Sequence, residues 1–231
     1  MKPLRAALLA AAVLGTGGGN AVLAADLVQQ NWQAPGVTQW TLSLTADYVL
    51  KQAPDSQIRI TAEPKVMRAI AVRIKGNRAE IDSSGSFSTQ KKLLVEISAP
   101  DFQRIAIHSS GGLKLNGLRG RRLQFSADDS SNATLARLQL EQLQIELAGS
   151  SSVDASGQTG DQQVKLEDSA SYHAGGLQSG SAKVSVSGSA DALVAVARNL
   201  QANVSDSATL KYRGKPSIRK QVEDAGTLEQ E

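Results

Sequence analysis

The sequence predicts an all-β protein, a parallel β-helix (β-solenoid) of about six rungs with an N-terminal strand region. A strand motif returns about every twenty residues, and the window that holds these repeats contains no proline. The composition agrees, because 41% of the 231 residues are hydrophobic but only 3% are aromatic, against 26 serines and 20 glycines. A core of small and β-branched side chains in thin layers is therefore expected.

Residues 1–24 have the organisation of a secretory signal peptide. Lys2 and Arg5 precede the apolar run Ala6–Leu14, and Val22-Leu23-Ala24 fits a signal-peptidase site. Nine apolar residues are too few to span a bilayer. We expect a mature chain that begins at Ala25 and is exported to the periplasm or the cell surface. It should have no membrane span and, without cysteine, no lipid anchor.

The charge and cysteine content exclude several classes of function. Removal of Lys2 and Arg5 leaves 23 basic against 22 acidic side chains, so the pI of 9.2 does not indicate nucleic-acid binding. The absence of cysteine excludes a disulfide framework, a thiol nucleophile and cysteine-ligated metals, and two histidines leave little for a histidine metal site. We therefore predict no cofactor and no nucleic-acid partner.

Strands are expected before the repeats. After an N-terminal segment at residues 25–36, residues 37–104 contain alternating stretches such as Ile58-Arg59-Ile60 and the turn signal Gly76-Asn77. Another strand at Leu93–Ile97 ends before a proline. This region is interpreted as antiparallel or mixed strands that lead into the solenoid.

The repeats and the C-terminal edge of the sheet occupy residues 105–220. A motif of apolar, variable and apolar residues recurs six times, and its second apolar residue is separated from the next copy by 18, 22, 19, 20 and 18 residues. A serine or an aspartate lies three residues after the second apolar residue of each motif. The motifs are Ile105-Ala106-Ile107, Leu123-Gln124-Phe125, Ile145-Glu146-Leu147, Val164-Lys165-Leu166, Val184-Ser185-Val186 and Ala202-Asn203-Val204. The later column is Ser110, Asp128, Ser150, Ser169, Ser189 and Ser207.

A coil of about twenty residues can turn once and pair each strand in parallel with its copy about 4.8 Å away. Residues such as Gly149, Asp168, Gly188 and Asp206, just before the serine column, suit a tight bend, because glycine and aspartate tolerate unusual φ angles. We interpret the serines as bonding to neighbouring coils. Residues 133–147 also partly fit a helical stripe, but their alternation keeps them in the solenoid.

The C-terminal end should be an open sheet edge. All prolines lie outside residues 101–215, and six rungs would make a rod of about 29 Å. Lys211, Arg213, Lys215 and Pro216 are residue types that blunt such an edge, although this basic cluster could also meet anionic groups. Residues 221–231 are expected to form a disordered acidic tail.

Several motifs resemble a known family. They are Leu93–Ile97, Ala99-Pro100-Asp101-Phe102-Gln103-Arg104-Ile105, the rung Val186-Ser187-Gly188-Ser189-Ala190 and the closing Leu210-Lys211-Tyr212-Arg213-Gly214-Lys215-Pro216. Over about residues 37–220 the chain resembles the bacterial "putative autotransporter adhesin head, GIN domain" family. The resemblance implies an exported, single-stranded right-handed β-helix, and it transfers no catalytic residue.

Two function classes remain open. The first is a non-enzymatic envelope or surface module whose flat faces contact a polysaccharide or another surface component. The second is a polysaccharide-active hydrolase or lyase. Two carboxylates about 5–10 Å apart could hydrolyse a glycoside, and Asp168 and Asp206, two rungs apart, would be about 9.6 Å from each other. Because both lie at bends, we favour the binding module.

The remaining signals favour structural roles. Asp128-Asp129 could bind calcium but fits a turn better, and His108 and Tyr172-His173 have no second ligand at metal spacing. Trp32 and Trp40 precede the repeats, and we expect them to cover the first rung, with sugar stacking as the alternative.

Overall fold

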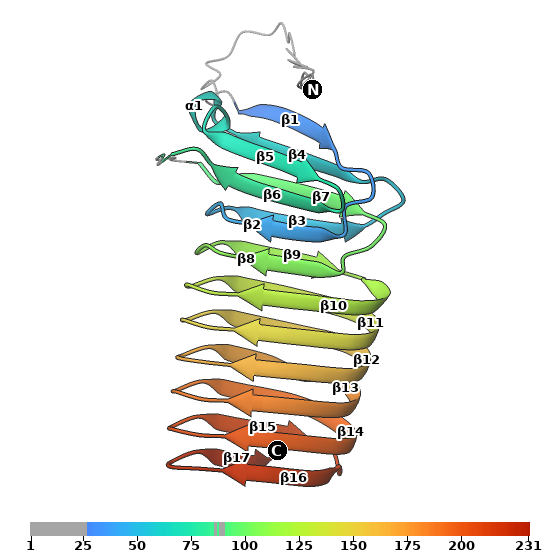
Figure 1. Ribbon diagram of the computed structural model, residues 1–231, viewed down its shortest axis with the longest axis vertical. Helices are drawn as coiled ribbons and strands as arrows, with labels where there is room; N and C mark the ends of the chain where they lie inside the picture. Colours follow the sequence, from blue (N-terminus) through green and yellow to red (C-terminus); the bar gives the residue numbers. More distant parts are fainter. Residues whose placement is uncertain (1–26, 86, 88–90) are drawn as a thin grey trace, which may run out of the picture.

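The protein is a rod of stacked β-coils, shown by a computed structural model that describes residues 27–85, 87 and 91–231 (Figure 1). Within these described residues, seventeen strands join in one continuous sheet that winds around the rod. The predicted parallel β-solenoid is thereby confirmed. The predicted signal peptide lies outside the described residues. The described residues form one helix, which has four residues. It is too short to cross a membrane.

The N-terminal end of the rod is closed by antiparallel strands. Strand β1 (Val28–Gln33) pairs with β4 (Gln57–Ala62), and β4 pairs in turn with β7 (Leu94–Ala99). Helix α1 (Pro64–Met67) begins at a proline, which suits a first helical turn, and leads into β5 (Ile70–Lys75). Strand β5 forms an antiparallel hairpin with β6 (Arg78–Ser83) across the predicted turn Gly76-Asn77. At this end β1 and β5 are the outer strands, each paired on one side.

The strand region before the repeats supplies coils of its own, in an order that differs from the sequence. Strands β2 (Gln39–Leu42) and β3 (Asp47–Gln52) form one coil, which pairs in parallel with β6 and β7 on one side. On its other side lie β8 (Arg104–Ile107) and β9 (Gly112–Asn116), also parallel. The earlier segment is thus inserted between two later ones, as Figure 1 shows.

Regular coils follow. They are built by β10 (Arg119–Ala127), β11 (Asn132–Leu147), β12 (Ser152–Leu166), β13 (Ser171–Val186) and β14 (Asp191–Val204). Each coil has a longer stretch on one face of the rod and a shorter stretch on the other. We call these the long-strand face and the short-strand face. Residues 133–147 belong to β11, so the solenoid interpretation of this stretch is confirmed over the helical alternative.

The coils stack in the predicted register with one exception. Ile107, Leu147 and Val186 lie in one column, as expected, but the member between Ile107 and Leu147 is Ala127 and not Phe125. The spacings along this column are therefore 20, 20, 19, 20 and 18 residues. The 22-residue interval predicted from the sequence is therefore wrong, because it places the second copy of the motif two residues too early. Its turn serine is Ser130 in place of Asp128, which makes the column serine in all six coils.

The C-terminal end has one more coil than predicted. After β15 (Thr209–Arg213), strands β16 (Ser217–Val222) and β17 (Thr227–Gln230) pair in parallel with β14 and β15. The expected disordered tail at 221–231 is therefore wrong, because most of it continues the stack. The last coil places Lys211 and Arg213 one coil away from the open edge, where Arg213 donates to the Glu231 carboxylate at 2.8 Å.

The core runs through the rod as columns of inward side chains. Its largest fully buried members are Trp40, Tyr48, Tyr172, Phe102 and Phe125, each in a different strand or turn. Trp32 on β1 is partly buried at the closed end, consistent with its expected covering role. Trp40 instead lies inside the stack, where β2 pairs with β6 and β8, and its ring centroid is 6.0 Å from that of Phe102. It therefore does not cover the first coil.

Candidate functional site

A groove runs along the long-strand face. It consists of two adjoining hollows of about 640 and 530 Å³ that share Arg122 and Gln142 on their walls. The first continues toward the open end as far as Arg219, and the second continues toward the closed end as far as Gln39. An elongated hollow of this kind can accommodate an extended chain better than a compact small molecule.

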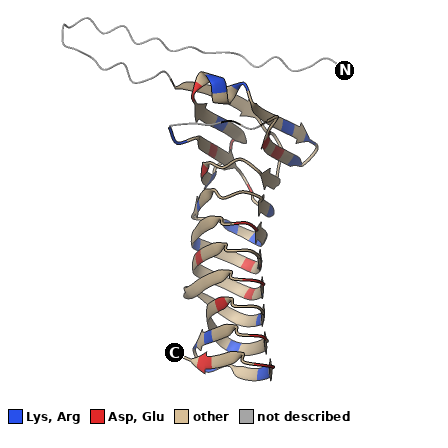
Figure 2. Cartoon of the chain, turned by 90° about the vertical axis from the view of Figure 1, so that its left-hand side faces the viewer, with Lys and Arg blue, Asp and Glu red and all other residues tan. Residues whose placement is uncertain are grey.

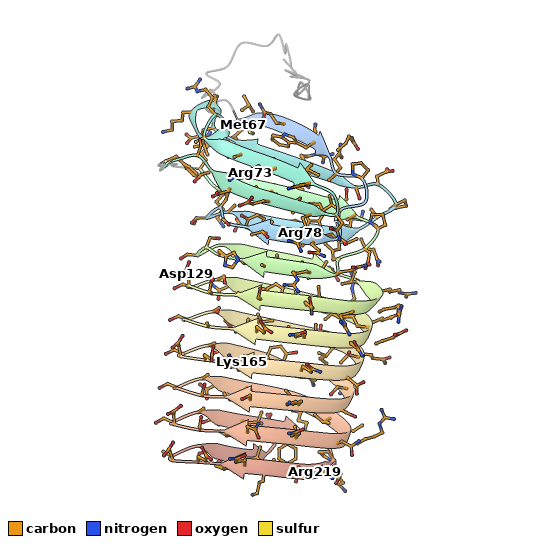
Figure 3. The ribbon with its side chains drawn as sticks, viewed as in Figure 1. Met67, Arg73, Arg78, Asp129, Lys165 and Arg219 are labelled. Atoms are coloured by element: carbon orange, nitrogen blue, oxygen red, sulfur yellow. The ribbon has the colours of Figure 1, made fainter. Side chains whose placement is uncertain are left out.

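One column of side chains follows the groove from end to end, and we call it the donor file. Every member is glutamine, arginine or lysine, so each presents N–H donors and none presents a carboxylate. Figure 3 labels its two ends, Arg78 and Arg219, on the same face of the rod. In order along the rod the file is Arg78, Gln39, Arg104, Gln124, Gln144, Gln163, Lys183, Gln201 and Arg219. All members except Arg78 line the two hollows.

Parallel register explains why these side chains align. Each member immediately precedes an inward residue of its coil and therefore points outward, because side chains alternate along a strand. Copies of the same position then recur in the next coil about 4.8 Å away. The result is a ladder whose geometry is set by the backbone of the sheet.

Hydrogen bonds between coils orient the middle of the file. Arg104 donates through Nη2 to Oε1 of Gln124 at 2.6 Å, and Gln124 donates through Nε2 to Oε1 of Gln144 at 3.0 Å. Gln144 then donates to a carboxylate oxygen of Glu146 at 2.7 Å. The carbonyl oxygens of Gln124 and Gln144 are therefore bonded to neighbouring side chains of the file.

Among the described residues, none of the four cations of the file has a protein counter-ion. Within the residues that the structure describes, neither Lys183 nor Arg219 forms an ion pair or a side-chain hydrogen bond. Both are exposed along the wall of the larger hollow. Exposed, unpaired cations on a rigid strand are ready to accept an anionic group from a ligand.

A second polar column forms the other wall. It contains Arg122, Gln142, Asp161, Ser181, Asn199 and Ser217. Arg122 donates through Nε and Nη2 to Oε1 of Gln142, at 2.9 and 2.6 Å. This wall therefore offers guanidinium, amide and hydroxyl groups together with the Asp161 carboxylate.

A buried polar network supports the floor of the groove. Gln162 is 1% exposed and donates through Nε2 to Oγ of Ser179 at 2.8 Å, while it accepts from the Tyr172 hydroxyl at 3.3 Å. The Ser179 hydroxyl donates a hydrogen bond to the Ala195 carbonyl oxygen at 2.8 Å. Burial raises the pKa of Tyr172, so its hydroxyl stays protonated. The satisfied network makes this part of the floor rigid.

The two aspartates of the enzyme alternative hold the bends of the coils. Asp168 and Asp206 have φ angles of 62° and 59°, in the left-handed region. The Asp168 Oδ2 accepts the backbone N–H of Gly149 at 3.0 Å, and the Asp206 Oδ2 accepts that of Gly188 at 2.9 Å. Each carboxylate thus satisfies a backbone donor of the preceding coil, outside both hollows.

The predicted histidine and calcium candidates form pairs and not clusters. His108 Nδ1 lies 2.7 Å from Asp128 Oδ2, and His173 Nδ1 lies 3.6 Å from Asp154 Oδ1. Asp129 has φ 59° and occupies the bend column, as the turn interpretation predicted. Across residues 27–85, 87 and 91–231, no three potential metal ligands gather at one point.

Sequence reasoning missed the donor file, although a signal was present. Gln124, Gln144, Gln163 and Gln201 each stand directly before an inward apolar residue at the period of the repeat. The members on β6 and β2 could not be found in this way, because those strands enter the stack out of order.

Comparison with known proteins identifies relatives of the whole rod. A family model described as "Putative auto-transporter adhesin, head GIN domain" matches residues 38–216, more than half of the chain. No curated protein matches the sequence.

Solved structures with the same fold come from species of Bacteroides and Parabacteroides. A putative adhesin from Bacteroides fragilis has a TM-score of 0.83 at 19% identity, covering 89% of this chain and 97% of its own. A putative lipid binding protein from Parabacteroides distasonis has a TM-score of 0.74 at 16% identity, with coverage of 92% and 98%. A putative adhesin from Parabacteroides merdae gives 0.69 at 15% identity, again with coverage of 92% and 98%. At these identities the likeness shows the fold alone.

Proposed function

The chain belongs to the auto-transporter adhesin head GIN domain family, and on this premise we propose that it is an exported, non-enzymatic binding module of the bacterial envelope or surface. The proposed compartment is the periplasm or the cell surface, reached through the signal peptide predicted at residues 1–24. The proposed partner is a polysaccharide or another polymeric surface component.

The observation that carries the proposal is the continuous groove with its donor file. Eight consecutive coils each contribute one donor side chain to the hollows, from Gln39 to Arg219. A solenoid presents the same contact at each coil and so binds an extended ligand by repetition. The regular spacing of about 4.8 Å is close to the advance of one sugar residue in an extended glycan.

The groove is polar, which favours a hydrated polymer over a lipid. Its walls are made mainly of glutamine, arginine, serine and asparagine. The large apolar side chains that are exposed in the described chain, Leu27, Val49, Ile74, Ile218 and Val222, line neither hollow. A lipid-binding role would need an apolar cavity at the site.

The bonding of Asp168 and Asp206 argues against the enzyme alternative. Each carboxylate already accepts a backbone N–H of a neighbouring coil, and neither lines the groove. A catalytic acid or nucleophile must instead face the substrate at bonding distance.

A glycan array followed by a reducing-end release assay tests the proposal. We expect the mature chain to bind at least one extended polysaccharide without releasing new reducing ends. Gln163→Ala combined with Gln201→Ala should weaken binding, whereas Thr134→Ala combined with His173→Ala, on the short-strand face, should leave it unchanged. Asp168→Asn and Asp206→Asn, made singly, should retain binding.

Turnover of a bound glycan that either Asp variant abolishes would replace the binding module with an enzyme. An array on which no glycan is bound above background would remove the polysaccharide from the proposal.

A further inference from the structure

The positions of positive charge in the donor file point to a particular class of glycan. Resting on the proposed function, we infer that the groove binds an extended acidic polysaccharide with one carboxylate per disaccharide repeat. Its carboxylates bind Arg104, Lys183 and Arg219, and its neutral sugars lie against the glutamines between them.

The donor file carries positive charge and no negative charge. Its nine members include four cations and no carboxylate. Elsewhere the rod mixes both signs, as Figure 2 shows, and the mature chain is close to neutral. A file with several cations and no carboxylate is therefore a local feature that favours a ligand with acceptors and negative charge.

Three cations of the file, Arg104, Lys183 and Arg219, are available to bind a ligand. Arg104 uses one guanidinium nitrogen, Nη2, in its hydrogen bond to Gln124, so most of its five N–H donors remain open. Lys183 and Arg219 have no ion-pair partner among the described residues. All three side chains are exposed and line the hollows, so a ligand carboxylate can reach them.

The cations of the file lie at regular intervals along the rod. Arg78 and Arg104 are two coils apart, with Gln39 between them, and Lys183 and Arg219 are two coils apart, with Gln201 between them. Arg104 and Lys183 are four coils apart. Every interval between cations is thus a multiple of two coils, or about 9.6 Å. This distance is close to the length of one disaccharide in an extended polysaccharide.

The same lining disfavours single-stranded nucleic acid. Its binding sites combine positive charge with aromatic side chains on which bases stack. The residues that line the two hollows include no aromatic side chain. Alternating amides and cations suit hydroxyl and carboxylate groups better.

The test compares hyaluronan, in which a uronate alternates with a neutral sugar, with its carboxyl-reduced form. Binding of both polymers is measured by calorimetry at low and at physiological ionic strength. The triple variant Arg104→Gln, Lys183→Gln and Arg219→Gln removes the charges but keeps amide donors. Its matched control, Lys51→Gln, Lys114→Gln and Lys211→Gln, removes the same charge from the short-strand face.

We expect the wild-type chain to prefer hyaluronan over the reduced polymer by about tenfold or more, since hydrogen bonds to charged groups are the stronger ones. The file variant should lose this preference, and the control should keep it. Thermal unfolding of both variants checks that the rod is intact.

Equal binding of the two polymers, or equal losses in both triple variants, would overturn the acidic ligand while the proposed binding module stands. Tighter binding of oligo(dT) than of hyaluronan would overturn it in favour of nucleic acid. Failure to bind these polymers, together with a blank glycan array, would remove the proposed polysaccharide ligand as well.

Discussion

Lys220 stacks directly on Ala202 in a column that is otherwise apolar. The coils before it place Phe125, Ile145, Val164 and Val184 in this inward position. Ala202 is fully buried, whereas Lys220 is exposed because no coil covers it. An inward-pointing charge on an edge strand is a known protection against further strand pairing.

The first prediction follows from this position. Lys220→Ile should let the open end pair with a second copy, because it restores an apolar column at an unpaired edge. Size-exclusion chromatography with light scattering should show association that increases with protein concentration. Gln221→Ile, one residue away and facing outward, is the control and should elute as the wild type does. A K220I protein with unchanged mass would show that Lys220 does not protect the edge.

The second prediction concerns the centre of the core. Val186 is 1% exposed and lies in the column of Leu166 and Val204. Val186→Asp should destabilise the rod by about 4 kcal/mol or more, since it buries an unpaired charge. Ser185→Asp, on the outward side of the same strand, should change stability by less than about 1 kcal/mol. Chemical denaturation measures both, and similar midpoints would contradict the stacked core.

The third prediction separates backbone strain from steric contact at the bends. Gly188 and Gly76 both have positive φ, 76° and 59°. A Cβ at Gly188 would lie 2.6 Å from the Asp168 carbonyl oxygen, whereas one at Gly76 would have open space. Gly76→Ala should cost about 1 kcal/mol from its φ angle alone. Gly188→Ala should cost more, roughly 2–4 kcal/mol, because the neighbouring coil must also shift.

Denaturant unfolding of these two variants provides the comparison. Equal losses in the free energy of unfolding of the two variants would mean that neighbouring coils can separate locally without cost.

The fourth prediction concerns pH and the last coil. The hydrogen bond from Arg213 lowers the pKa of Glu231 below its ordinary 4.5. A lowered folded-state pKa stabilises the fold above the ordinary value, and this contribution is lost as the pH falls through the lowered pKa. Amide exchange in β17, corrected for intrinsic rates, should therefore become faster relative to β15 in acid. Glu231→Gln should exchange faster at neutral pH and remove this dependence.

The sequence predicted the architecture because the core repeats. Inward positions such as Ile107, Leu147 and Val186 recur at a nearly constant interval, and only stacked coils use such an interval throughout. The two-residue error arose because Leu123, Phe125 and Ala127 all face inward. Alternation alone cannot choose between neighbouring inward positions, and the larger Phe125 was favoured over the correct Ala127.

The C-terminal coil and the groove were harder to predict for a different reason. Strands β16 and β17 carry polar sequences such as Arg219-Lys220-Gln221, and their pairing comes from the coil beneath them and not from their own pattern. The donor file depends on strands that meet only after folding. Gln39 lies between Arg78 and Arg104, an order that no reading along the chain would produce.

The insertion of the β2–β3 coil between its two later neighbours bears on how the rod is built. Residues 39–52 cannot complete their pairing until the chain as far as residue 116 has emerged, because one neighbouring coil ends there. The pairing of this coil therefore depends on contacts between residues far apart in the sequence, and such contacts slow folding. The remaining coils can then be added one by one in chain order, from β10 towards the C-terminal coil.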